Sequence, residues 1–178
     1  IKENGRVILV ASFEEGKLIE PLAILKKDAL GVGLGKVVPD LDGVVRRTTP
    51  FYKIADTLKP FPLFAYRVAA ASAQLNEEPD AKPRYIGFWG EEGSFRHISF
   101  YDVLEKRIAA EFFKDKIVLI GATALGLYDI HPIPFDPIFP GIEINANLVY
   151  DYLNNFFVKE TPYPVSYTHL TLPTNREV

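Results

Sequence analysis

The sequence predicts an α/β fold in a single domain, with a mixed central sheet flanked by helices. Runs of β-branched and other apolar residues, typical of buried strands, occur at residues 6–12 and 116–121. Apolar residues recur at helical spacing within residues 62–75 and 141–154. The chain of 178 residues is long enough to bury one substantial core, so we expect its strands and helices to share that core.

The first half is expected to contain a strand, a short helix and a hairpin. Glycine alternates with apolar residues over residues 31–38, which predicts a close-packed strand. The Asp- and Gly-rich stretch 39–43 predicts a turn into a strand at residues 44–52, so that 31–52 would form a β-hairpin. Before it we expect, in order, a strand at residues 6–12 and a short helix at residues 22–28 that Pro21 opens.

The middle of the chain is expected to alternate helices and strands. A helix begins at Pro62, and Ser99 with Asp102 resembles a capping box for another helix that ends at Arg107. The predicted apolar stripe of the first helix consists of Phe64, Val68, Ala71 and Leu75. Between the two helices we expect, in order, a polar linker at 76–83, a strand at 84–89, a turn at 90–93 and a short strand that ends at Ile98.

The last third is expected to contain the centre of the sheet and the final helix. Residues 116–121 give the strongest strand signal and, being apolar on both faces, predict a central strand. A loop that contains Pro132, Pro134, Pro137 and Pro140 follows, and loops of this kind often carry function. Residues 141–154 predict a helix whose apolar face consists of Ile142, Ala146, Val149 and Leu153.

Composition excludes several classes of protein. The net charge of −3, from 20 basic and 23 acidic residues, gives no footprint for nucleic acid. The chain has no Cys, which excludes disulfides and thiolate metal sites. Its longest nearly uncharged stretch, residues 117–128, is shorter than the roughly 20 residues that span a bilayer. We therefore expect any membrane anchor to lie outside this sequence.

Five segments, in order, resemble the second type of CHASE domain, a cyclase/histidine-kinase-associated sensory extracellular domain. They are DLDGVVRR at 40–47, ISFYDVL at 98–104, KDKIVLIGATA at 114–124, DIH at 129–131 and FPGIEINAN at 139–147. The resemblance runs from about residue 6 to residue 157. We expect residues 1–160 to form this domain in part, without its usual N-terminal strands, and residues 161–178 to be a non-native or disordered tail.

The resemblance implies an extracytoplasmic sensor in a membrane-anchored bacterial receptor. Its partners would be an unknown small-molecule or environmental signal, its own transmembrane helices, and a cytoplasmic cyclase, kinase or diguanylate cyclase module. A homodimer is a further partner to consider. Asn145 stands where such domains often carry His before Ala-Asn. The resemblance does not make this chain an enzyme, and we expect no cofactor.

The sharpest polar cluster pairs Asp40 and Asp42 with Arg46 and Arg47. The arginines could recognise a carboxylate or phosphate. Alternatively, the aspartates stabilise a turn and the arginines neutralise them, and we favour this structural interpretation.

A second group of candidates follows the predicted central strand. Gly121 and Thr123 could donate hydrogen bonds to a small anion at the end of that strand, or they could form only a tight turn. Asp129 and His131 could bind a ligand, although they are too few for a metal site without more donors. Fixing the loop by hydrogen bonds is the alternative for this pair.

Three function hypotheses follow. The leading one is a sensory input domain, the second is a structural dimerisation domain, and the third is a small-molecule α/β enzyme. No Gly-x-Ser-x-Gly motif occurs, and the only histidines outside the tail are His97 and His131. Catalysis is therefore the least favoured of the three.

Overall fold

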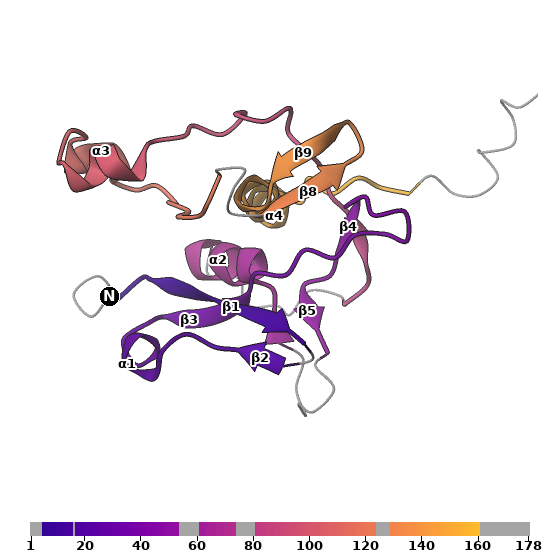
Figure 1. The fold of residues 1–178 in the computed structure, drawn as a ribbon, viewed down its shortest axis with the longest axis horizontal. Helices are drawn as coiled ribbons and strands as arrows, with labels where there is room; N and C mark the ends of the chain where they lie inside the picture. Colours follow the sequence, from indigo (N-terminus) through magenta and orange to yellow (C-terminus); the bar gives the residue numbers. More distant parts are fainter. Residues whose placement is uncertain (1–4, 16, 54–60, 74–80, 124–128, 161–178) are drawn as a thin grey trace, which may run out of the picture.

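The N-terminal part of the chain forms a mixed three-stranded sheet of β1 (Ile8–Glu14), β2 (Lys17–Ile19) and β3 (Gly31–Leu34). The computed structural model describes residues 5–15, 17–53, 61–73, 81–123 and 129–160 (Figure 1). The strand order is β2-β1-β3, with β1 antiparallel to β2 and parallel to β3. The short helix α1 (Ala23–Lys26) lies in the connection between β2 and β3, so the first predicted strand and helix are confirmed.

Two longer helices stack above this sheet. Helix α2 (Phe64–Ala73) contacts β1 and β3 on one side and α4 (Gly141–Asn154) on the other. The hairpin of β8 (Ile130–Ile133) and β9 (Asp136–Pro140) covers α4. Figure 1 shows the resulting order of layers: the sheet, α2, α4 and the hairpin. The predicted α/β class and the two helices are confirmed, but only α2 packs against the three-stranded sheet, whereas α4 packs against α2 and β9.

The remaining elements are short. They are β4 (Arg47–Thr48) paired with β7 (Arg84–Tyr85), β5 (Phe51–Tyr52) paired with β6 (Phe61–Pro62), helix α3 (Phe100–Leu104) and a 3-10 turn (Ala110–Phe113).

The apolar core lies between α2, α4 and the β8–β9 hairpin. Its most buried large side chain is that of Phe139, which is 0% exposed. The core consists of Val45, Leu63, Phe64, Ala65, Tyr66, Val68, Ile86, Ile133, Phe139, Ile144, Leu148 and Val149. The α2 stripe predicted from Phe64 and Val68 is therefore correct in part, but Ala71 is exposed and Ala65 and Ala69 are buried in its place. Leu75 lies outside the described residues.

The predicted central strand at residues 116–121 is not formed. Among the described residues no strand pairs with it, so its N–H and C=O groups have no ladder to join. Leu119 packs against the core, whereas Ile117, Val118 and Ile120 are 42%, 50% and 75% exposed. The sheet is therefore not centred on this segment, and its central strand is β1, which lies between β2 and β3.

Two predictions about hairpins are also wrong. Residues 31–52 do not form a hairpin, because β3 pairs with β1 and β4 pairs with β7. The Pro-rich stretch from Pro132 to Pro140 is not a loop but the β8–β9 hairpin, with a register shift between His131 and Ile133. Proline is tolerated in such a two-stranded ribbon because each strand has a free edge, where a missing N–H costs nothing.

Smaller differences concern the region that follows β7. The strand predicted at 84–89 is shortened to two residues, and no strand ends at Ile98. Helix α3 forms, but the Ser99 side chain makes no capping hydrogen bond, and Asp102 accepts a hydrogen bond from Arg107 instead. The predicted turns at 39–43 and 90–93 are present.

Close packing of α2 on β3 depends on Gly33. A Cβ atom at this buried position would overlap the backbone Cα of Phe64 at the start of α2, and rigid backbone cannot rotate away. The absence of a side chain at Gly33 therefore allows the sheet to pack closely against α2.

We predict that Gly33→Ala lowers the free energy of unfolding by about 1–3 kcal/mol or more, because it overpacks the sheet–helix contact. Gly35→Ala is the matched control, since its added methyl would meet only the half-exposed side chain of Val10, which can rotate. Urea denaturation of both variants measures the difference. Equal losses for the two variants would contradict this account of the contact.

Candidate functional site

Helix α4 carries three buried polar residues along one face. Glu143, Asn147 and Asp151 are spaced four residues apart and are 2%, 1% and 0% exposed. Residues at i, i+4 and i+8 lie above one another on an α-helix. Burial of three such side chains is costly unless each one is hydrogen-bonded.

The partners of these side chains are backbone N–H groups of residues 87–95. Gly87 donates to Asp151 Oδ2 at 2.9 Å, and Trp89 donates to Asn147 Oδ1 at 2.8 Å. Gly93 donates to both carboxylate oxygens of Glu143, at 2.9 and 3.1 Å. We call these three side chains and the segment 87–95 the polar ladder. It supplies the hydrogen bonds that a neighbouring strand would otherwise supply.

The helix supports the polar ladder from within. Asn147 Nδ2 donates to the carbonyl oxygen of Glu143 at 2.9 Å, which directs its Oδ1 toward Trp89. At the upper end of the ladder, His97 Nε2 lies 3.6 Å from Glu143 Oε2. In its protonated form, His97 would therefore form an ion pair with the buried carboxylate of Glu143.

Asp151 is the electrostatically unusual member of the ladder. Its Oδ2 is hydrogen-bonded to Gly87, but its Oδ1 has no hydrogen-bond partner among the described residues. Burial raises the pKa of the Asp151 carboxyl to about 7, and the hydrogen bond from Gly87 offsets only part of that effect. Burial also raises the pKa of the adjacent Tyr152 phenol. Near neutral pH, Asp151 therefore exchanges between its charged and neutral forms.

The structure gathers four of the predicted site residues around the first turn of α4. Gly121 lies against Ile142, and a Cβ there would come within 2.7 Å of that side chain. Asp129 accepts a hydrogen bond from the Gly141 N–H through its backbone oxygen, at 2.9 Å. Its carboxylate Oδ1 lies 3.3 Å from His131 Nε2. Asn145 is buried and donates to the Gly141 carbonyl oxygen at 2.9 Å. Thr123, by contrast, is exposed.

The other four predicted residues form one ion-pair network in the turn before β4. Arg46 contacts Asp42 at 2.8 Å and Asp40 at 3.3 Å, and Arg47 contacts Asp40 at 2.7 Å. The hydrogen bond from Arg46 lowers the pKa of Asp42 to about 2, and the hydrogen bond from Arg47 lowers the pKa of Asp40. The two arginines thus bond to the aspartates of their own turn.

A metal site receives no support in the described part of the chain. No group of three or more His, Asp or Glu side chains there lies close enough to hold a metal ion. Asp136, which follows His131 in the sequence, accepts a hydrogen bond from the Ile138 N–H and so stabilises the hairpin turn.

Sequence reasoning missed the polar ladder because it assigned the wrong face of α4 to the core. Of the predicted face, Ile142 and Ala146 are only half-buried, Leu153 is 37% exposed, and Val149 alone is buried. The signal that could have found the ladder is the four-residue spacing of Glu143, Asn147 and Asp151. Polar residues at that spacing usually indicate a solvent-facing stripe, so the pattern by itself favours the opposite orientation.

Comparison with known proteins identifies one family. The model of the CHASE2 domain, the second type of CHASE domain, matches residues 2–172. No curated protein and no solved structure matches the chain. Within the described residues, every helix is too short or too polar to cross a bilayer.

We predict that Asn147→Leu lowers the free energy of unfolding by about 1–3 kcal/mol, because it leaves the Trp89 N–H without an acceptor. Asn154→Leu is the control, since Asn154 makes the same bond to the carbonyl four residues earlier but is exposed at the end of α4. Denaturation gives the stabilities, and hydrogen exchange at Trp89 reports the lost bond. Unchanged exchange at Trp89 would show that the ladder bond contributes nothing.

We predict that Asp151 makes the fold less stable as pH rises from about 4 to about 7. Its pKa is raised on folding from an ordinary value of 3.8 to about 7. Within that window the folded state therefore holds a proton that the unfolded state has released, and this stabilisation is lost as pH rises through about 7. Stability should be measured by urea denaturation across this range.

The Asp151→Asn variant keeps an acceptor for Gly87 but cannot ionise. It should show a flatter pH profile and be about 1–3 kcal/mol more stable than the parent above pH 7. Asp115→Asn, at an exposed position, controls for the loss of a carboxylate. Parallel profiles for the parent and Asp151→Asn would rule out Asp151 as the titrating group.

Proposed function

This chain belongs to the CHASE2 domain family, and we propose that it is the input domain of a membrane-anchored bacterial signalling receptor. CHASE2 domains are sensory extracellular domains, so the chain is a sensory, extracytoplasmic domain and not a catalytic one. In our proposal it recognises a small-molecule or environmental signal. It passes the change through transmembrane helices of the same protein to a cytoplasmic nucleotide cyclase, histidine kinase, Ser/Thr kinase or diguanylate cyclase.

The observation that carries this proposal is the way α4 is held. The bonds of the polar ladder extend from Glu143 to Asp151, which is about 12 Å along the helix axis. Because all of them join one helix to one segment, a shift of α4 by one residue would break them together. An element held in this way favours two discrete positions over a continuum. A signal that prefers one position would shift the population between them.

The first turn of α4 is where we propose that the signal acts on this helix. Gly121, Asp129, His131 and Asn145 all lie at this turn. The Asp129–His131 pair is partly exposed, with side chains 47% and 28% accessible, so a ligand or proton can reach it. The segment that joins Asp40 to Arg47 contacts β8, since the Val45 N–H donates to the Pro132 carbonyl oxygen. A change at β8 would therefore reach both groups of residues.

A dimerisation domain is the second candidate, and one observation favours it. Helix α3 and the segment 116–121 expose large apolar side chains, and Figure 1 shows α3 apart from the stacked layers. Such side chains, when they gather in a patch, mark interfaces. They are Phe100, Tyr101, Leu104, Ile117, Val118 and Ile120. Two results together would support this role. Sedimentation would detect a dimer of the chain, and the output of the intact receptor would not change with any signal tested.

We predict that Asp129→Ala changes the signal response of the intact receptor without unfolding the domain. The Asp129 backbone oxygen, which bonds Gly141, is kept, whereas the carboxylate contact with His131 is lost. Output activity with and without stimulus measures the response, and the thermal midpoint should move by less than about 2 °C, because exposed pairs contribute little.

Asp28→Ala, in the turn between α1 and β3, is the control for removing a carboxylate elsewhere. It should leave the response unchanged. An unaltered response in Asp129→Ala would count against the first turn of α4 as the signalling site.

A further inference from the structure

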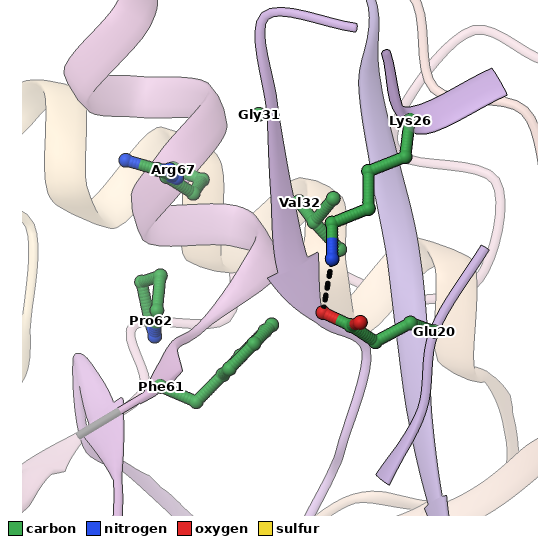
Figure 2. A pocket seen from close by; sticks show the side chains of 7 residues that line it. All are labelled: Glu20, Lys26, Gly31, Val32, Phe61, Pro62 and Arg67. Carbon is green, nitrogen blue, oxygen red and sulfur yellow. Dashed lines mark hydrogen bonds and ion pairs between the residues drawn. The ribbon is translucent and has the colours of Figure 1, made fainter. Parts of the chain in front are cut away.

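An open cavity of about 310 Å³ lies on the opposite side of α2 from α4, between the sheet and the β6 strand. Figure 2 shows residues from five neighbouring parts of the chain around it: the end of β2, α1, β3, β6 and α2. Neither group of predicted site residues contributes to its lining. A volume near 300 Å³ is at the lower end of small-molecule sites and suits a metabolite of about amino-acid size.

Arg67 is the cationic group of this cavity. Within the described part of the chain its guanidinium makes no hydrogen bond or ion pair. It lies flat over Gly31, since a Cβ there would be 3.1 Å from Nε and 3.2 Å from Nη2. The absence of a side chain at Gly31 therefore provides the space for the guanidinium. Contact with strand β3 restricts this group, so binding an anion would cost less side-chain entropy than at a free surface arginine.

The second cation of the cavity is already neutralised. Lys26 Nζ forms an ion pair with Glu20 Oε1 at 2.7 Å, and Figure 2 draws this pair on the other side of β3 from Arg67. Two cationic side chains and one anionic side chain line the cavity, so its net charge is +1. A single negative charge on the ligand balances it, and a dianion would exceed it.

The other walls are apolar. Val32, Phe61 and Pro62 are half-buried, so each presents part of its surface to the cavity. An inorganic anion would leave this surface in water, whereas an organic body of similar size would cover it. Covering apolar surface contributes roughly 25 cal/mol per Å². The walls therefore favour a ligand with an apolar or aromatic body.

We propose that this cavity binds a small organic monocarboxylate, with its carboxylate on Arg67 and its apolar body against Phe61, Val32 and Pro62. The planar guanidinium can hold both carboxylate oxygens at once. The cavity is a site separate from the first turn of α4, and the proposal rests on the proposed function only for the consequence that its occupancy is also a signal. Binding itself is testable on the chain alone.

The test is isothermal titration of the 178-residue chain with phenylacetate, which has a single carboxylate and an aromatic body. Phenylacetate should bind with a dissociation constant in about the millimolar range, as expected for so small a ligand. Acetate and inorganic phosphate, which lack the body, should bind at least about tenfold more weakly. Phenethylamine, which has the body and the opposite charge, should not bind. Phosphate binding as strong as phenylacetate binding would overturn the proposal.

Variants assign the binding to Arg67. Arg67→Gln should weaken phenylacetate binding by about tenfold or more, and Arg67→Lys, which keeps the charge without the fork, should lose part of it. Gly31→Ala should also weaken binding, because its methyl group displaces the guanidinium. Lys27→Gln, next to Lys26 but not in the cavity, is the control and should bind like the parent. If Arg67→Gln is folded by circular dichroism and binds phenylacetate like the parent, the assignment is wrong.

The intact receptor separates this proposal from the function. One outcome is that phenylacetate binds the parent but not Arg67→Gln, and yet leaves the receptor output unchanged. This result would support the cavity as a binding site and count against it as the signal input. No binding up to about 10 mM, by the parent and by Arg67→Lys alike, would overturn the cavity proposal and leave the sensory function standing.

Discussion

The backbone N–H groups of residues 87–95 require acceptors, and the structure meets this requirement with side chains of α4. The segment has no neighbouring strand among the described residues, and a buried N–H group that lacks a partner, such as that of Gly87, would cost about 1–3 kcal/mol. Glu143, Asn147 and Asp151 provide the acceptors and become buried in doing so. Gly87 has no side chain because the backbone oxygen of Phe156 occupies that space. The need to pair these N–H groups thus accounts both for the polar residues of α4 and for the glycine at position 87.

The position of α4 follows from this constraint and connects the rest of the molecule. With its polar face turned to residues 87–95, Ile144, Leu148 and Val149 are left to form the core with α2 and the β8–β9 hairpin. The first turn then lies under Asp129, which fixes the Gly141 N–H. Any displacement of α4 must therefore disturb the polar ladder, the core and the Asp129–His131 pair together. This linkage is what a domain that converts a local event into a global change requires.

The charged groups differ in what they can contribute to such a change. Asp40 and Asp42 are paired with arginines near the surface, and their lowered pKa values keep them ionised over the physiological range. Exposed pairs of this kind contribute little free energy. Asp151 is buried with one unpaired oxygen and titrates near pH 7. Arg67 is exposed, unpaired in the described residues and positioned in a cavity. Arg67 and Asp151 therefore have more freedom to bind an anion or a proton than the Asp–Arg cluster, whose charges are already paired.

The sequence by itself determined the α/β class, strands β1 and β3 and helices α2 and α4, because these depend on local propensity and periodicity. It also located the Asp–Arg turn, whose partners lie within seven residues of each other. Only the tertiary structure decided which strands pair, that residues 116–121 lack a partner, and which face of α4 is buried. Those outcomes depend on groups far apart in the chain, such as Gly87 and Asp151, 64 residues apart. From periodicity alone, the polar face of a helix is predicted to face solvent. That prediction fails for α4 because backbone donors distant in the sequence bond to its polar side chains.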